Sequence, residues 1–196
     1  MKDYKKIAKN LMVLALAFSL LIPMNFHTKG ADDVLTDGDF QYKVVQSGNE
    51  KEAKFYGYTG QSEDIVIPET LGGYKVTYVN SLDGCKASVK SLSISKNVKG
   101  VSDILEVVDC VGKDQKIELE KYEVVSDNPY LSVKDGVLFN KDQTMLLNYP
   151  RGKKDEKYTE PSTVKFSNGA SQNGYVKSWV LSVNKENLKT ADYGYW

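Results

Sequence analysis

Short apolar runs, each followed by a turn signal, recur along the chain and predict β-strands. The clearest example is DIVIPETLGGYKVTYV at 64–79, where the apolar run ends at Pro68. Proline lacks a backbone N–H donor and therefore ends a strand, and the glycine pair at 72–73 turns the chain. An alternating segment follows through Val76 and Val79. The stretch therefore predicts two strands joined by a tight turn.

Weaker copies of this strand predict a repeat architecture. If the second apolar residue of each run is its anchor, Ile67 is followed by Ile94 after 27 residues (67 to 94) and by Leu119 after a further 25 (94 to 119). A period of this size is typical of solenoids, in which one strand per coil stacks on the next. Alternation is expected to direct one set of side chains inward: Ile65, Ile67, Leu92, Ile94, Ile117, Leu119, Leu181 and Val183. A second set is expected to face outward: Val66, Ser93, Glu118 and Ser182.

Two further segments predict β-hairpins. At 40–58, FQYKVV and AKFYGY alternate on either side of the turn-forming SGNEKE, and this hairpin is expected to cap the first coil. At 128–150, an inserted unit is expected to form strands separated by turns at Asp-Gly (135–136) and at NKDQ. Residues 101–111 are equally consistent with a short helix and with a strand.

The first 30 residues predict a signal peptide. A lysine-rich start precedes the apolar run LMVLALAFSLLIP at 11–23, which is shorter than the about 20 apolar residues that span a membrane. Small residues before Ala31 favour cleavage there, and an uncleaved membrane anchor is the alternative. We therefore expect a secreted or cell-surface protein, with a linker at 31–39, a solenoid domain at 40–196 and no membrane contact beyond the signal peptide.

Composition narrows the chemistry that the mature chain can perform. The chain has 26 basic and 26 acidic residues, and removal of the five lysines and one acid of 1–30 leaves 21 and 25. The remainder is mildly acidic and without a Lys/Arg cluster, so nucleic acid is not an expected partner. The only histidine, His27, lies in the leader, which excludes Ser-His-Asp catalysis and His-ligated zinc from the mature chain.

No motif in the chain predicts a cofactor, a metal or a catalytic residue. Phosphate-binding loops, dinucleotide-binding loops, Cys-x-x-Cys pairs and nucleophile elbows are absent from the sequence. The oxygen-bearing side chains of Asn140 and Asp142 match no calcium-loop spacing and indicate a solvated turn. We therefore expect a protein that is not an enzyme.

Several of these segments resemble the BspA-type leucine-rich repeat family of bacterial surface proteins. The family repeat is a strand ending in Ile-Pro, a short turn, a Val-x-x-Ile stretch and then Ala-Phe-x-x-Cys, and IVIPETLGGYKVTYV and SLDGC match it. NPYLSVKDGVLFNKDQTMLLNYPRGK is similar to the family's recurrent N…Y…DGVL(F/Y)N…L…YP unit. The resemblance covers most of 40–190.

The chain also departs from the family repeat. Ala-Phe is missing before Cys85, Ser95 replaces the proline after Ile94, and Glu160 replaces the isoleucine before Pro161. The resemblance therefore implies a short, degenerate member whose fold is mainly β. It is expected to be a leucine-rich-repeat-type solenoid with an N-terminal hairpin cap and an inserted hairpin unit.

The two cysteines, Cys85 and Cys110, are one repeat period apart. Adjacent coils lie about 4.8 Å apart, so equivalent positions fall within disulfide reach. Export would permit a disulfide. The alternative is a pair of stacked, buried thiols at the position where the family usually has cysteine. A catalytic cysteine is not expected, because no histidine is available to activate it.

Aromatic residues near strand ends and turns form the candidate binding surface. They are Tyr74, Tyr78, Tyr130, Tyr149, Tyr175 and Trp179. An amphipathic ring at such a position can face a glycan or a protein partner, or it can cover the edge of the core. The resemblance implies an adhesion-like, non-catalytic binding module that contacts protein or glycan. The alternatives are a secreted glycoside hydrolase with a carboxylate pair, or a drifted fragment of a larger surface protein.

Overall fold

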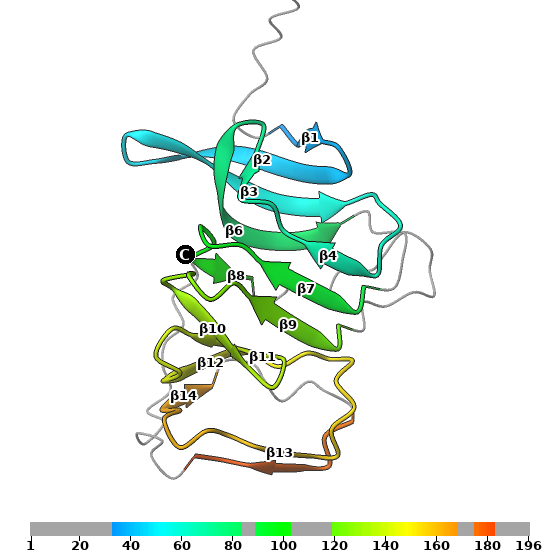
Figure 1. The fold of residues 1–196 in the computed structure, drawn as a ribbon, viewed down its shortest axis with the longest axis vertical. Helices are drawn as coiled ribbons and strands as arrows, with labels where there is room; N and C mark the ends of the chain where they lie inside the picture. The colour runs from blue at the N-terminus through cyan, green and yellow to red at the C-terminus, as the bar shows by residue number, and fades with distance from the viewer. Residues whose placement is uncertain (1–32, 84–88, 103–118, 168–174, 183–196) are drawn as a thin grey trace, which may run out of the picture. The chain divides into compact units, whose positions relative to one another are not determined.

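The computed structural model describes residues 33–83, 89–102, 119–167 and 175–182. All of them belong to the second of two compact units in the chain, Ala31–Trp196. Every regular element in these ranges is a β-strand, and none of the described residues forms a helix long and apolar enough to cross a membrane (Figure 1). The strands are β1 (Leu35–Asp37), β2 (Phe40–Ser47), β3 (Glu50–Tyr58), β4 (Asp64–Val66), β5 (Thr70–Leu71), β6 (Tyr74–Asp83), β7 (Ser91–Ile94), β8 (Gly100–Val101), β9 (Lys121–Val124), β10 (Leu131–Lys134), β11 (Val137–Asn140), β12 (Met145–Asn148), β13 (Lys157–Thr159), β14 (Phe166–Ser167) and β15 (Ser178–Val180).

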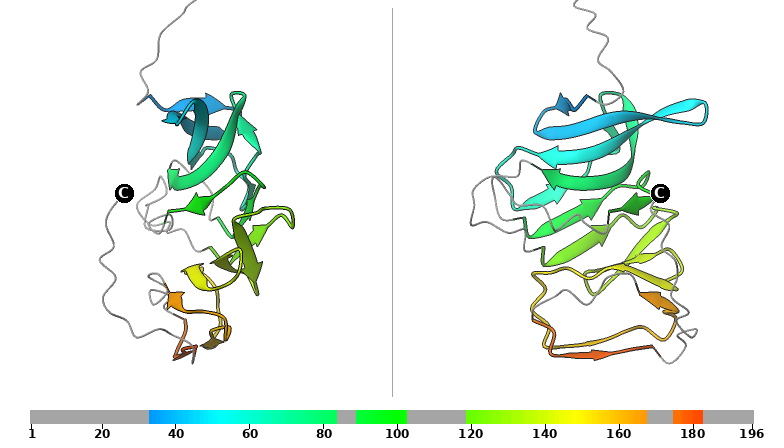
Figure 2. Two further views of the ribbon diagram at one scale, coloured as in Figure 1. Left: turned by 90° about the vertical axis from the view of Figure 1, so that its left-hand side faces the viewer. Right: turned by 180° about the vertical axis from the view of Figure 1, so that it is seen from behind.

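The centre of the fold is a parallel ladder of three short strands from successive coils. Strand β7 pairs on one side with β4 and on the other with β9, so that Ile65, Leu92 and Tyr122 lie side by side (Figures 1 and 2). The offset between paired positions is 27 residues from β4 to β7 and 30 from β7 to β9. This arrangement confirms the predicted mainly β solenoid.

The predicted register of the third repeat is wrong. Val124, rather than Leu119, pairs with Ile94, because the chain between β7 and β9 is longer than the previous coil. Leu119 is still buried, just before the strand begins. Glu123 takes the outward position expected for Glu118, which lies outside the described residues, and its Oε2 accepts a hydrogen bond from Ser93 Oγ at 2.9 Å.

The last repeat also differs from the prediction. Strand β15 pairs in parallel with β13 and places Trp179 beside Tyr158, and Trp179 packs on the core. Leu181, expected to face inward, is 56% exposed, whereas Ser182, expected to face outward, is only 7% exposed. The inward and outward positions are therefore exchanged at this end.

The predicted N-terminal hairpin is present and continues into the solenoid. Strands β2 and β3 pair antiparallel through a turn at Gly48, whose φ of +60° suits glycine. Strand β3 then pairs in parallel with β6, aligning Ala53 with Val76. Within 31–39, expected to be a linker, β1 adds a short edge strand to β2.

The inserted unit also forms as predicted, as the antiparallel strands β10, β11 and β12. Asp135 and Gly136 both have positive φ, +53° and +77°, which is the geometry of a type I′ hairpin turn. A Cβ at Gly136 would lie 2.9 Å from Lys121 Cβ, and the Gly136 carbonyl accepts the Tyr122 N–H at 2.9 Å. Glycine thus lets the hairpin turn pack directly on β9.

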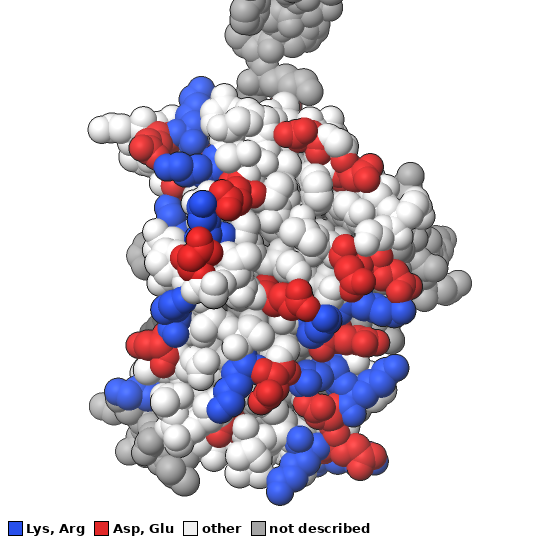
Figure 3. Space-filling model, viewed as in Figure 1, with Lys and Arg blue, Asp and Glu red and all other residues white. Residues whose placement is uncertain are grey.

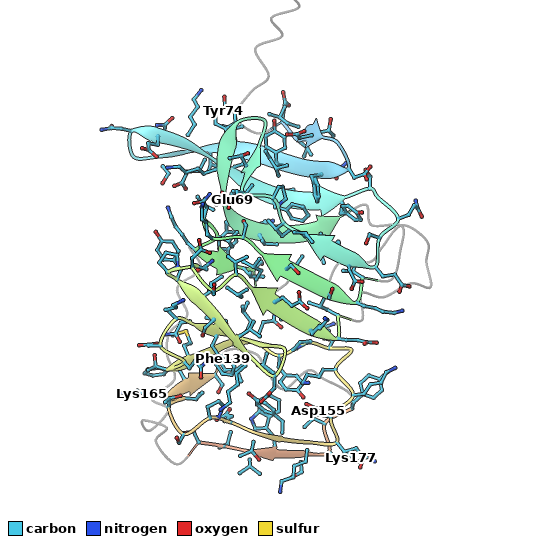
Figure 4. All side chains as sticks on the ribbon, viewed as in Figure 1. Glu69, Tyr74, Phe139, Asp155, Lys165 and Lys177 are labelled. Atoms are coloured by element: carbon cyan, nitrogen blue, oxygen red, sulfur yellow. The ribbon has the colours of Figure 1, made fainter. Side chains whose placement is uncertain are left out.

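Two apolar clusters fill the described part of the solenoid. The larger extends from the hairpin cap to β11 and includes Phe55, Leu92 and Tyr122. The smaller lies beneath β11, β12 and β13 and includes Phe139, labelled in Figure 4. Its rings Tyr149, Tyr158 and Trp179 pack edge to face, with centroids 4.7 to 5.0 Å apart, an arrangement that aromatic pairs favour.

Glu160, where the family repeat has isoleucine, is a buried carboxylate with a full set of donors. Its Oε1 accepts hydrogen bonds from Ser167 Oγ at 2.7 Å and Trp179 Nε1 at 2.9 Å. Its Oε2 accepts the backbone N–H of Ser182 at 2.9 Å. These hydrogen bonds offset the cost of burying the carboxylate charge. They also join Glu160, which follows β13, to β14 and to the end of β15.

Asn128 plays a similar role between the loops that follow β7 and β9. Its side chain is fully buried, and its Nδ2 donates to the carbonyls of Ser95 and Val98 at 2.9 and 3.0 Å. Its Oδ1 accepts the backbone N–H groups of Tyr130 and Leu131, each at 2.8 Å. One side chain therefore joins two coils through four hydrogen bonds.

Several predictions concern residues outside the described ranges. These are the signal peptide at 1–30, the inward positions of Ile117 and Val183, the proximity of Cys85 and Cys110, and the nature of most of 101–111. They stay predictions.

We expect Asn128→Ala to lower the free energy of unfolding by about 3 kcal/mol, because it leaves buried carbonyl and N–H groups without partners. Urea denaturation of the variant and the parent protein measures this difference. The matched control is Ser126→Ala, at an exposed position two residues away, for which a change below about 0.5 kcal/mol is expected. Equal stability of the Asn128 variant and its control would contradict the role assigned to Asn128.

Candidate binding groove

A groove of about 350 Å³ crosses β3, β6 and the loops that follow β7 and β9. This volume lies within the range of about 300–1,000 Å³ that is usual for ligand sites. The lining residues are Glu50, Glu52, Lys75, Thr77, Lys96, Asn97, Lys99, Asp127, Pro129 and Tyr130. Most are polar or charged, so the groove differs from the largely apolar pockets that take drug-like molecules.

The solenoid repeat places these residues together. Thr77 follows Glu52 by 25 residues, and its Oγ1 donates to Glu52 Oε2 at 2.8 Å. In the next coil, the Lys99 N–H donates to the Thr77 carbonyl at 2.8 Å. Asn128, 30 residues after Val98, donates a hydrogen bond from Nδ2 to the Val98 carbonyl. Its Oδ1 accepts the backbone N–H of Tyr130. The groove therefore runs along the stack, with each coil contributing to its lining.

Five of the six charged side chains that line the groove are paired within the protein. Lys99 Nζ lies 2.8 Å from Glu52 Oε1, and Lys75 Nζ lies 4.0 Å from Glu50 Oε2. Lys96 Nζ lies 3.2 Å from the carboxylate of Glu69, which is labelled in Figure 4. Figure 3 shows basic and acidic side chains interspersed over the face seen in Figure 1 rather than gathered by sign. The groove therefore does not present a predominantly positive or a predominantly negative electrostatic potential to a ligand.

Two carboxylates of the groove, Glu50 and Glu52, form ion pairs. Glu52 is the more enclosed of the two, with 15% of its side chain exposed. Burial alone would raise its pKa, but hydrogen bonds from Lys99 and Thr77 and the charge of Lys99 together lower the pKa of Glu52 below its ordinary value. The same pairing raises the pKa of Lys99. A general acid needs a raised pKa, so Glu52 is suited to holding the groove together rather than to donating a proton.

Tyr130 gives the groove an aromatic rim. The residue is 44% exposed, and its backbone N–H donates to Asn128 Oδ1 at 2.8 Å. Pro129 precedes it and restricts the backbone further. The ring is therefore presented from a fixed loop and not from a freely moving one.

The described residues include no group of three or more His, Cys, Asp or Glu side chains placed to hold a metal ion. In the turn after β11, Asp142 Oδ1 accepts hydrogen bonds from Thr144 N and Oγ1, and Asn140 Nδ2 donates to the same hydroxyl. These bonds lower the pKa of Asp142. Both side chains thus stabilise the turn itself.

The six candidate aromatics do not form one surface, and only Tyr130 lines the groove. Tyr74 is half-buried against the larger cluster. Tyr78 is also half-buried, and Lys54 Nζ lies 5.5 Å from its ring centroid. Tyr175 is 40% exposed outside the groove.

Tyr149 and Trp179 belong to the smaller cluster. Tyr149 is only 3% exposed and its hydroxyl donates to Asp155 Oδ2 at 3.0 Å. Burial, with the hydrogen bond to Asp155 and its negative charge, raises the pKa of Tyr149. Packing against Tyr158 and Trp179 encloses the Tyr149 ring, which agrees with the alternative that this ring covers the core.

Nine of the ten lining residues were not predicted, because they are ordinary polar residues of turns and strand ends. The sequence holds one signal that points to them, namely polar side chains that recur at the repeat interval. Glu52 and Thr77, 25 residues apart, are an example.

No family model matches the chain, and no curated protein matches it. The chain is similar to a leucine-rich repeat protein from Eubacterium ventriosum ATCC 27560, at 31% identity over 62% of this chain and 30% of that protein, with a TM-score of 0.46. It is also similar to the pneumococcal vaccine antigen PcpA, at 17% identity over 79% of this chain and 65% of that one, with a TM-score of 0.35. The chain thus spans less than two thirds of either protein. Its own coils and groove define a short β-solenoid with a polar groove along the stack.

The lowered pKa of Glu52 predicts a pH-dependent contribution to stability. A carboxylate whose pKa is lower in the folded state stabilises the fold above its unfolded pKa, and loses this effect as the pH falls through the folded pKa. Glu52→Gln is therefore expected to cost up to about 1 kcal/mol at neutral pH, and this difference should shrink below pH 4.5, the ordinary value. Urea denaturation at several pH values measures it.

The matched control is Glu50→Gln, because the Glu50 side chain is 74% exposed. It should change stability by less than about 0.5 kcal/mol at any pH. If the difference for Glu52→Gln instead grew as the pH fell, the pKa of Glu52 would be raised, and a proton-donating role would regain support.

Proposed function

We propose that this chain is a secreted or surface-displayed binding module, that it is not an enzyme, and that it contacts a protein or glycan through the groove. The observation that carries the proposal is the groove itself, which draws its lining from four successive segments of the stack. Solenoids commonly use surfaces assembled from several repeats for binding. The leader-like residues 1–30 support export, and the resemblance of the repeats to bacterial surface proteins supports an adhesion-like role.

The electrostatics of the groove favour binding over hydrolysis. Three carboxylates, Glu50, Glu52 and Asp127, line it, and a carboxylate pair is what a glycoside hydrolase requires. Such an enzyme also needs one carboxyl group with a raised pKa. The most enclosed of the ion-paired carboxylates, Glu52, has a lowered pKa and is held by Lys99. The paired charges therefore support a role in which the groove binds its ligand unchanged.

Filling the groove should abolish binding without unfolding the protein. Asn97→Trp places a large side chain in the lining, and Val66→Trp places the same side chain on β4, where Val66 is 65% exposed and outside the groove. Beads coated with each protein are tested for retention on surfaces coated with mucin, which offers both polypeptide and glycan. We expect the parent and the Val66 variant to be retained, and at least about a tenfold loss for the Asn97 variant.

Two outcomes would contradict the proposal. Equal retention of the Asn97 and Val66 variants would place binding outside the groove. Release of reducing sugar from mucin by the parent protein, but not by Glu52→Gln, would identify a hydrolase and remove the non-catalytic assignment.

A further inference from the structure

We propose that the groove takes a neutral glycan, an oligosaccharide without carboxylate, sulfate or phosphate groups, which stacks on Tyr130 and bonds to Asp127, Asn97 and Thr77. This inference rests on the proposed function and assigns its ligand class. The charges, the apolar surface and the hydrogen-bonding groups of the lining residues support it.

The charges favour a ligand without net charge. Three acidic and three basic side chains line the groove, so their formal charges cancel. Lys99 and Lys96 are held by Glu52 and Glu69 at 2.8 and 3.2 Å. An ionic ligand would have to compete with these partners, and an exchange of one ion pair for another yields little free energy at a solvated surface.

The apolar surface suits a sugar ring better than a peptide side chain. Of the ten lining residues, only Pro129 and the ring of Tyr130 are apolar, and no Val, Leu, Ile or Met side chain lines the groove. Peptide partners are usually anchored by apolar or aromatic side chains that enter well-packed pockets. A sugar instead offers a flat face of C–H groups, which can cover an exposed tyrosine ring while its hydroxyl groups remain solvated or hydrogen-bonded.

The polar groups around the ring match neighbouring sugar hydroxyls. Asp127 contributes a carboxylate, which accepts strong hydrogen bonds from O–H donors. The amide of Asn97 is oriented by its own bond from Nδ2 to the Glu69 carbonyl at 3.2 Å. The Thr77 hydroxyl donates to Glu52 at 2.8 Å, which leaves its oxygen as an acceptor. These three groups offer acceptors, and Asn97 Nδ2 adds a donor.

The site is also ordered before any ligand arrives. Asn128 Oδ1 accepts the backbone N–H groups of both Tyr130 and Leu131, and Pro129 restricts the backbone between Asn128 and Tyr130. Binding therefore costs little additional ordering of the loop, which is how a small and polar site attains useful affinity.

The test is binding of the purified protein to two arrays. One carries short oligosaccharides of uncharged hexoses together with their sulfated counterparts, and the other carries peptides of mixed sequence. We expect binding to uncharged oligosaccharides, with less than about a twofold change between about 0.05 and 0.5 M salt, because screening affects only charged partners. Tyr130→Ala should weaken this binding at least about tenfold, whereas Tyr130→Phe, which keeps the ring, should stay within about threefold.

The matched control is Tyr175→Ala, which removes another exposed tyrosine outside the groove and should leave binding unchanged. Circular dichroism of each variant checks that it is folded. Binding to peptides or sulfated sugars alone, lost in Tyr130→Ala, would overturn the neutral-glycan assignment and leave the proposed function standing. Binding that is unaffected by Tyr130→Ala and Asn97→Trp, or no binding on either array, would overturn both.

Discussion

Backbone hydrogen bonds between parallel strands of successive coils are the interaction on which the rest of the structure depends. Strands β4, β7 and β9 have only three or four residues each, too few to be stable alone. They are joined by register pairs and by bonds just beyond them, such as Ile67 N–H to the Ser93 carbonyl at 2.9 Å. The stacked strands in turn direct Ile65, Leu92 and Tyr122 into one core.

The groove is a consequence of the same stacking. Parallel coils in register bring residues one or two repeats apart into contact, and so Glu52 meets Thr77, 25 residues further on, and Lys99, 47 residues further on. Where the coils lengthen, side-chain hydrogen bonds maintain the register in place of regular repeats. Asn128 joins the loops that follow β7 and β9 in this way, and Glu160 joins the last described coils. The irregularities of the chain are therefore compensated by buried polar side chains with a full set of partners.

The parts of the fold that depend on local sequence could be predicted. The hairpin turns at Gly48 and at Asp135-Gly136 follow from residues that accept positive φ, and the first repeat interval follows from two similar apolar runs. The third and fourth registers could not be predicted, because Tyr122 and Trp179 replace the aliphatic anchors and the coil length changes to 30. Most of the groove could not be predicted either, because the register must be known before its residues can be identified as neighbours.

The central claim is that one hydrogen-bonded stack both stabilises the core and fixes the groove. Amide hydrogen exchange tests it most directly, because exchange from the most stable elements requires global unfolding. The account predicts the slowest exchange for the amides of Leu92 and Tyr122, similarly slow exchange for Tyr130, whose N–H bonds to Asn128, and faster exchange for the edge strand β1. Exchange at Tyr130 as fast as in an unfolded peptide, or at Leu92 as fast as in β1, would contradict it.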